Sequence, residues 1–141
     1  MRGLEILEGT VVPIPKGGED QARIFWRLFG FREVMKPAGE KGIWLQHEGK
    51  TLALKVTDPF EPVRDKPSAV ILVDDVEGYR KQFTAKRARV LDSAVLPGWR
   101  RFVVLDPFQN RVEVRAKARE GMADASAREL DAGFPGSADR L

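Results

Sequence analysis

Residues 100–115 read RRFVVLDPFQNRVEVR, two strand-like runs on either side of a turn. The turn contains Asp, Pro and Asn, which favour chain reversal, so the stretch predicts a β-hairpin. In the second run Val112 and Val114 alternate with Glu113. Because side chains alternate across a strand, the valines face a core and the carboxylate faces the other way. Glu113 is therefore a candidate metal ligand, a candidate general base or an ordinary exposed glutamate.

The composition limits the class of protein. The chain has 141 residues, 43% hydrophobic and 32% charged, which suits one globular domain. Its net charge is +3, but Lys and Arg are spread among nearly as many acids, so we expect no nucleic-acid partner. The absence of cysteine excludes disulfides, thiolate metal sites and a cysteine nucleophile. Without a long apolar run or a signal-peptide pattern, we expect a cytoplasmic protein with no membrane partner.

The first half of the chain predicts a strand, a helix and three further strands. Residues 9–15 read as a strand, and residues 16–31 change to helical spacing with Ala22, Phe25, Trp26 and Phe29 on one face. A short strand follows at 31–36, and then a hairpin over 42–56 that turns at 47–50. Residues 57–67 hold three prolines and many charges, which is typical of a connector.

The second half repeats this order. A strand over 68–75 precedes a helix over 75–88, which has Val76, Tyr79 and Phe83 on one face. A short strand at 89–93 and the hairpin described above complete the half. Residues 11–15 align with 70–74 at an offset of 59, and 51–55 align with 111–115 at an offset of 60. A repeat of this length predicts two similar βαβββ units packed together, because neither buries its apolar face alone.

The repeat sets the predicted domain organisation. One domain covers 1–117, with module one at 4–57, a linker at 58–67 and module two at 68–116. The tail, residues 118–141, is rich in Ala, Gly and charge, with a short helix expected over 122–131 and a mobile end. The tail is either a loosely docked appendage or a helix that covers a partner subunit.

Three segments together resemble the vicinal-oxygen-chelate superfamily, the group of glyoxalase I, bleomycin-resistance proteins and extradiol dioxygenases. ARIFWRLFGF (22–31) is similar to the family's ARxFYxxxLGF, with Trp26 where Tyr is usual. VDDVEGYRKQF (73–83) is similar to VDDVDAxxxxL. DPFQNRVEV (106–114) is similar to DPxGNxxE, with Gln109 where Gly is usual. The resemblance covers residues 4–116.

The resemblance implies an α+β fold, in which two βαβββ modules form an open, cup-shaped mixed sheet with helices outside and a cavity inside. Metal-using members place four ligands in the cup, and these positions fall here on Gly9, Ala53, Ser68 and Glu113. The repeat agrees with this register, since Gly9 matches Ser68 at the 59 offset and Ala53 matches Glu113 at the 60 offset.

Three of these four positions cannot bind a metal tightly. Glycine and alanine have no donor atom, and a neutral serine hydroxyl is a poor ligand, so Glu113 alone does not make a divalent site. We therefore expect no metal and no other cofactor. His47, the sole histidine, falls with Glu48 in the predicted hairpin turn, where we expect an exposed residue.

Strand alternation assigns further side chains to the cup as candidate ligand-binding residues. Trp44 either fills space inside the cup or stacks on a ligand, and the cations are either solvated or recognise an anion. Glu113 is either ion-paired with Arg111, Arg101 or Lys55, or poised as a base. The candidates are Val11, Trp44, Gln46, Thr51, Ala53, Lys55, Ser68, Val70, Leu72, Arg111 and Arg115, with Trp99, Arg100 and Arg101 in a loop at the rim.

Three functions remain open from the sequence. The first is a metal-free member that binds an anionic or aromatic small molecule in the cup, as bleomycin-resistance proteins bind their ligand, with the cup between the subunits of a homodimer. The second is a lyase or isomerase of glyoxalase type that uses Glu113 for acid–base chemistry. The third is a structural module whose cup is filled by its own side chains.

Overall fold

The computed structural model describes residues 3–8, 10–92 and 96–117. The first half of the chain forms β1 (Leu4–Glu8), β2 (Val11–Pro15), α1 (Glu19–Arg27), β3 (Arg32–Val34), β4 (Ile43–His47) and β5 (Lys50–Thr57). The second half forms β6 (Ala69–Val73), α2 (Val76–Ala85), β7 (Arg89–Leu91), β8 (Trp99–Leu105) and β9 (Arg111–Lys117). The fold is α+β, as the sequence predicts. Gly9 and the helix expected over 122–131 lie outside the described residues.

Both helices form where apolar spacing and end signals coincide. Glu19 and Asp20 occupy the first turn of α1, where carboxylates favour the positive end of the helix dipole. Gly30 then adopts a φ of 96°, which lets the chain leave the helix. In α2 the side chain of Asp75 caps the first turn by accepting a hydrogen bond from Gly78 N at 2.9 Å. The apolar face expected for each helix is buried.

The strands form two sheets. A four-stranded sheet has the order β2-β5-β4-β3, and a five-stranded sheet has the order β1-β6-β9-β8-β7. Strand β1 was not expected from the sequence as a separate strand. It pairs antiparallel with β6, so the first strand of the chain joins the sheet of module two. Its side chains alternate, with Leu4 buried and Glu5 exposed, but only pairing with a distant strand reveals its place.

The repeat predicted from the sequence is present in the strand register. Val11 on β2 lies beside Ala53 on the parallel strand β5, and Val70 on β6 lies beside Glu113 on the parallel strand β9. These pairs have the same 59 and 60 offsets as the sequence alignment. The two modules therefore place corresponding residues at corresponding points of their sheets.

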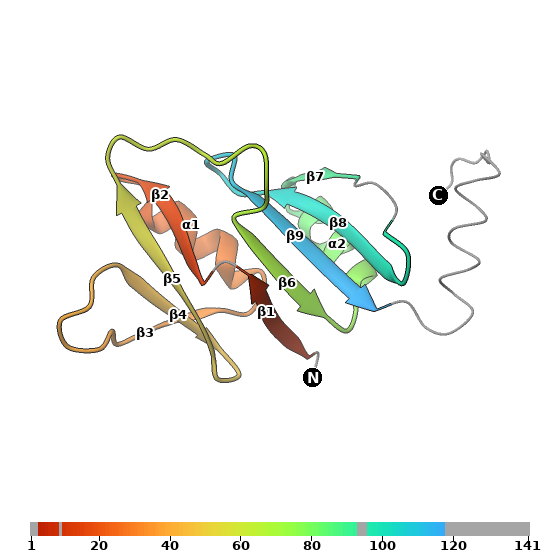
Figure 1. Cartoon of the computed structure of the whole chain (residues 1–141), viewed down its shortest axis with the longest axis horizontal. Helices are drawn as coiled ribbons and strands as arrows, with labels where there is room; N and C mark the ends of the chain where they lie inside the picture. The colour runs from red at the N-terminus through yellow and green to blue at the C-terminus, as the bar shows by residue number, and fades with distance from the viewer. Residues whose placement is uncertain (1–2, 9, 93–95, 118–141) are drawn as a thin grey trace.

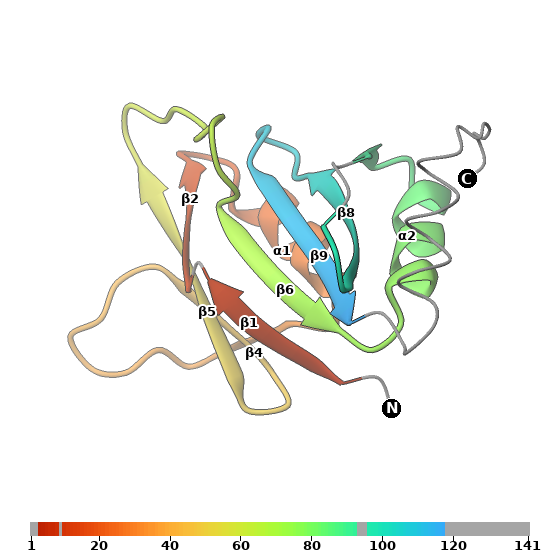
Figure 2. The ribbon, with the colours of Figure 1, turned by 45° about the vertical axis from the view of Figure 1, so that its right-hand side comes forward.

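Both helices lie on the same side of the two sheets. In Figure 1 they pass behind the strands, and in Figure 2 the turned view brings α2 out to the right while α1 remains behind β6 and β9. The residues facing the helices, such as Leu52, Leu54, Val112 and Val114, are fully buried. We call the opposite side of each sheet, which bears Ala53 in module one and Glu113 in module two, the open face. No helix of the described residues covers it.

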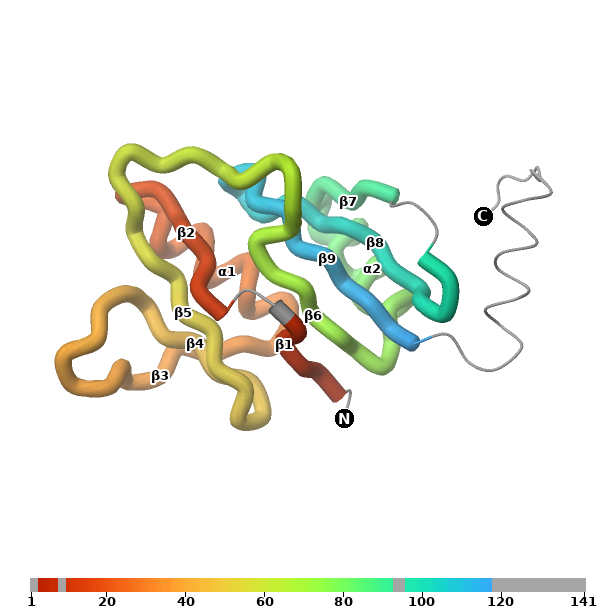
Figure 3. The backbone as a smooth tube through the Cα atoms, viewed as in Figure 1, coloured from red at the N-terminus to blue at the C-terminus, as the bar shows by residue number. Residues whose placement is uncertain are grey.

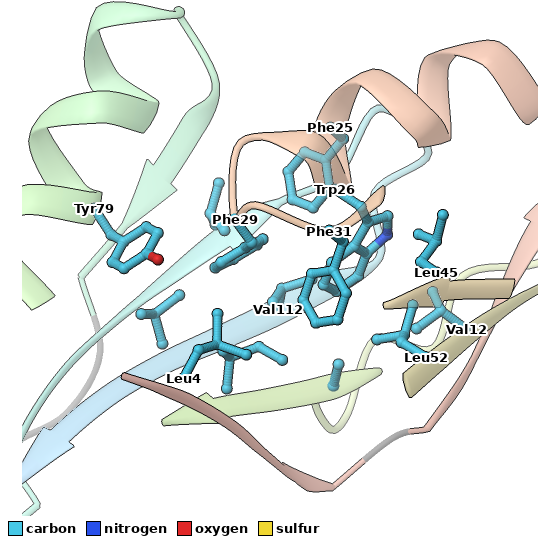
Figure 4. Packing of buried hydrophobic residues seen from close by; sticks show 14 of the residues in the cluster. Leu4, Val12, Phe25, Trp26, Phe29, Phe31, Leu45, Leu52, Tyr79 and Val112 are labelled. Carbon is cyan, nitrogen blue, oxygen red and sulfur yellow. The ribbon is translucent and has the colours of Figure 1, made fainter. Parts of the chain in front are cut away.

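A single aromatic core joins the two modules under the sheets. Phe25 of α1 lies 5.5 Å from Phe83 of α2 between ring centroids, and Phe29 lies 5.6 Å from Tyr79. Figure 4 shows Phe25, Phe29 and Tyr79 between the two helices, with side chains from both sheets below them. The modules therefore share one hydrophobic core, and burial of these rings holds them together.

The turn between β8 and β9, residues 106–110, also bridges the modules. Asn110 is fully buried and its side-chain amide donates to Pro13 O of β2 at 2.8 Å. Phe108 contacts Phe60 of the linker in an edge-on arrangement, 6.2 Å between ring centroids. Figure 3 shows the turn of module two beside the linker that leaves β5.

No described helix is long and apolar enough to cross a membrane.

Candidate functional site

Glu113 lies near the middle of the open face of module two. The strand register places it between Val70 on β6 and Val103 on β8. Although no described helix covers this face, Glu113 is only 5% exposed and both valines are 2% exposed. A buried carboxylate needs compensation, because removing its charge from water costs several kcal/mol.

Two arginines supply that compensation. Arg101 Nη1 donates to Glu113 Oε2 at 3.3 Å, and Arg115 Nε donates to the same oxygen. The guanidinium of Arg115 also lies over the ring of Trp99, 5.5 Å from the ring centroid. We call Trp99, Arg101, Glu113 and Arg115 the Glu113 cluster. Two cations against one anion leave the cluster with a net positive charge.

The sequence prediction of Glu113 in an ion pair is partly met. Arg101 was one expected partner, whereas Arg115 was expected only to flank the carboxylate. The antiparallel register explains the outcome, because β8 and β9 place Arg101 opposite Arg115. Both arginines therefore lie two residue pairs along from Glu113, which is the next pair on the same face of the sheet and within reach of its side chain. Lys55, another expected partner, is an exposed residue of the four-stranded sheet.

The expected rim loop is wrong. Residues 99–101 belong to strand β8, and their side chains alternate between the two faces of the sheet. Trp99 and Arg101 lie on the open face, as the cation–π contact and the ion pair show. Arg100 points to the helix side instead, where Arg100 Nη2 donates to Glu77 Oε2 at 2.8 Å. Arg100 is therefore not part of the open face.

The open face of module one has fewer charged side chains than that of module two, and its residues are more exposed to solvent. Val11 is 53% exposed, and beside it Ala53 is half-buried between Val11 and Trp44 in the strand register. The Trp44 indole donates to Lys41 O at 3.1 Å, so its polar group is satisfied locally. The remaining candidates of this face are Gln46 and Lys55, which are exposed, and Thr51, which is half-buried.

Ser68, Val70, Leu72 and Arg111 complete the set predicted from the sequence. Ser68 Oγ donates to Asn110 Oδ1 at 3.4 Å, which ties this hydroxyl to the 106–110 turn. Leu72 and Arg111 are half-buried, and both lie on strands adjacent in the five-stranded sheet. The structure thus gathers the module-two candidates around Glu113.

The donors at the family's metal positions do not fit a divalent cation. Ala53 has no donor atom, the Ser68 hydroxyl is engaged with Asn110, and the Glu113 carboxylate is engaged with two guanidiniums. Gly9, the fourth position, lies outside the described residues. Among the described residues, no group of three or more His, Asp or Glu side chains is arranged to hold a metal ion.

The expectation that His47 is an exposed turn residue is also wrong. His47 ends β4 rather than lying in the turn, and its side chain is only 20% exposed. The ring packs on Phe31 and its Nδ1 lies 3.0 Å from Gly30 O. The turn itself consists of Glu48 and Gly49, both at positive φ, as two-residue hairpin turns require. The His47 ring therefore packs against the residues that follow α1.

Sequence reasoning missed the part played by Asp106 and Asn110. Asp106 is 4% exposed, and its carboxylate accepts hydrogen bonds from Phe108 N, Asn110 N and Asn110 Nδ2, each at 2.8 Å. Burial raises the pKa of the Asp106 carboxyl above its usual value, and the hydrogen bonds from Asn110 and Phe108 oppose that rise. The signal was present in the DPFQN turn, whose Asp and Asn were assigned to chain reversal alone.

Three cavities lined by described residues lie away from Glu113. The largest of three has a volume of about 500 Å³ and is on the helix side, between α1, the segment after α2 and the 106–110 turn. A second, of about 490 Å³, is lined by residues 61–65 of the linker, and a third, of about 270 Å³, includes His47. None of these three includes a residue of the Glu113 cluster.

Comparison with known proteins identifies the fold. No family model and no curated protein sequence matches the chain. Among solved structures, the chain is similar to a protein from Bacillus anthracis assigned to the glyoxalase family, with 28% identity and a TM-score of 0.66, over 76% of this chain and 90% of that one.

Two further structures are proteins that bind antibiotics. One is an antibiotic-binding protein from Streptomyces, with 19% identity and a TM-score of 0.59, covering 78% of this chain and 95% of that one. The other is a bleomycin-binding protein in complex with bleomycin, with 18% identity and a TM-score of 0.58, covering 78% of this chain and 98% of that one. Identities this low show a shared fold.

Proposed function

Because this chain has the fold of the vicinal-oxygen-chelate superfamily, we propose that it binds an anionic or aromatic small molecule without the usual metal. The observation that carries the proposal is the Glu113 cluster. At a family metal position the carboxylate is neutralised by Arg101 and Arg115, and a tryptophan lies beside them. These groups match an aromatic carboxylate in both charge and shape.

The charge balance of the cluster favours an anion. Glu113 uses one oxygen, Oε2, for both arginines, and Arg115 makes this contact through Nε, so the two terminal nitrogens of the Arg115 guanidinium lie beyond that contact. Guanidinium groups bind carboxylates with two parallel hydrogen bonds, which gives strong and oriented recognition. The ring of Trp99 supplies an apolar surface against which a planar ligand can stack.

The same geometry argues for binding rather than acid–base chemistry. A general base must present a free lone pair to the proton that it removes. The Glu113 carboxylate is nearly buried and is ion-paired with Arg101 and Arg115, which keeps it occupied. We therefore assign Glu113 the role of balancing the charge of the two arginines, and we place no reaction step on it.

The proposal includes a homodimer that completes the cup. The three cavities described above do not include the Glu113 cluster, whereas small-molecule sites are usually concave. Two large apolar side chains are exposed near the point where the two sheets adjoin: Leu7 on β1, 43% exposed, and Val11 on β2, 53% exposed. A second copy that brings its module-one face over this surface buries these side chains and encloses the Glu113 cluster.

A self-filled structural module is the second candidate. Val70 and Val103 are almost fully buried on the open face, which shows that side chains of this chain already cover part of it. In that case Arg101 and Arg115 serve only to neutralise Glu113, and no small anion binds. The two candidates differ in one measurable property, the affinity of the open face for a carboxylate.

The test uses 2-naphthoate, an aromatic carboxylate, titrated into the full chain and followed by calorimetry. We expect binding that survives a chelator, and about tenfold weaker binding in Arg115→Gln, because one charge-assisted hydrogen bond is lost. Arg100→Gln is the matched control, since Arg100 lies on the adjacent strand β8 but faces α2. Equal affinity in all three proteins, or no binding by the wild type, contradicts the proposal.

A further inference from the structure

One of the three cavities described above lies on the helix side of the sheets, opposite the Glu113 cluster. It is an open groove of about 500 Å³ between α1, the residues that follow α2 and the 106–110 turn. Its lining comes from both modules, so the groove exists only because the two modules pack together. We call it the helix-side groove.

The floor of the helix-side groove is apolar. Ile24, Phe25 and Leu28 line it from one face of α1, and Leu105 and Pro107 line it from the other module. Ile24 is 59% exposed, because it lies off the buried face of α1 that Ala22, Phe25 and Trp26 form. The exposed part of the floor can therefore accept an apolar chain and remove it from water.

The rim of the groove carries positive charge. Lys86, Arg87 and Arg89 follow α2 within four residues and all three line the cavity. The acid in the lining is Asp106, whose carboxylate is buried and accepts three hydrogen bonds within its own turn. An apolar floor with a cationic rim matches an amphiphile that has a carboxylate head and an apolar body.

Two residues of the lining have a backbone conformation that favours glycine. Arg87 has a φ of 63° and Gln109 has a φ of 77°. Arg87 follows the C-cap of α2, where Arg87 N bonds to Thr84 O, the position that glycine usually occupies at a helix end. Both positions carry long polar side chains at a conformational cost, and both line the same groove.

We propose that the helix-side groove is a second ligand site that takes a single-chain amphiphilic carboxylate. Its carboxylate binds the rim at Arg87 and Gln109, and its chain lies on Ile24, Phe25 and Leu28. The strained backbone at Arg87 and Gln109 persists because their side chains contact the ligand. This site is independent of the function proposed for the Glu113 cluster, since the two sites lie on opposite faces of the sheets.

The test uses decanoate as the probe, with decanol as the uncharged control, and measures binding to the full chain by calorimetry. Arg87→Gly and Gln109→Gly relieve the positive φ, so we expect each variant to keep or raise its melting temperature. We expect decanoate to bind about tenfold or more weakly to Arg87→Gly, as for one lost charge-assisted hydrogen bond. Decanol binds weakly to all of these proteins.

Glu48→Gly is the matched control, because Glu48 also has a positive φ, of 49°, but lies in the β4–β5 turn outside the groove lining. It should gain stability and bind decanoate like the wild type. Arg115→Gln, which alters the Glu113 cluster, should also leave decanoate binding unchanged. The proposal is overturned if the wild type does not bind decanoate, if Arg87→Gly binds it with wild-type affinity, or if Arg115→Gln abolishes the binding.

Discussion

The two modules have the same architecture but different open faces. In module one Val11 and Ala53 are neighbours on the parallel strands β2 and β5, and Val11 is 53% exposed. In module two the equivalent pair is Val70 and Glu113, which are 2% and 5% exposed. The repeat therefore fixes the backbone positions. The side chains at these positions make the open face of module one more exposed and that of module two charged and more buried.

The hairpin turns differ in the same way. Module one reverses its chain with Glu48 and Gly49, a two-residue turn of exposed residues. Module two uses the five residues 106–110, which bury a carboxylate and reach across to Pro13 of module one. The difference shows that module two supplies both the charged site and the polar link between the halves, while module one supplies apolar surface.

The largest expected effect on stability comes from breaking the longer turn. Asp106→Ala removes the acceptor for three buried or partly buried N–H groups, so we expect unfolding free energy to fall by about 2 kcal/mol or more. Glu48→Ala, in the equivalent turn of module one, loses no buried partner and should cost at most about 0.5 kcal/mol. Urea denaturation of both variants measures the contrast, and equal losses contradict it.

A smaller effect is expected in the pH dependence of the same turn. Burial raises the folded pKa of Asp106 above its unfolded value near 3.8, so the folded state holds its proton to higher pH. The contribution of Asp106 to stability is therefore present below the unfolded pKa and is lost as pH rises through the folded pKa. Subtracting the Asp106→Asn variant removes the contributions of the other carboxylates. The wild type should lose stability relative to the variant from about pH 4 upward, whereas a constant difference rules out the raised pKa.

The sequence predicted much of the fold because its strongest signals are local. The apolar spacing of Ala22, Phe25 and Trp26 and of Val76, Tyr79 and Phe83 located both helices, and the alternation around Glu113 gave the correct face. The 59 and 60 offsets gave the correspondence between positions of the two modules. Strand β1 was missed because its five residues acquire a place only by pairing with β6, far along the chain.

The site was harder to predict because its contacts are not local. The sequence placed Glu113 on the open face. It did not show which cation forms the ion pair with Glu113, because several candidates lie near one another on neighbouring strands. Only the β8–β9 register sets Arg101 against Arg115 and sends Arg100 to Glu77. The turn residues Asp106 and Asn110 likewise acquire their importance from burial against module one, which alternation within one strand does not reveal.

The most direct measurement is the affinity of Glu113→Gln for 2-naphthoate. Glu113 competes with a bound anion for Arg101 and Arg115, so removing its charge should tighten binding about five- to tenfold, an increase that salt reduces. The thermal melt of the variant shows that it remains folded. If binding instead weakens or disappears, or if the wild type binds only after a divalent metal is added, Glu113 acts on the ligand or on a metal, and the account is contradicted.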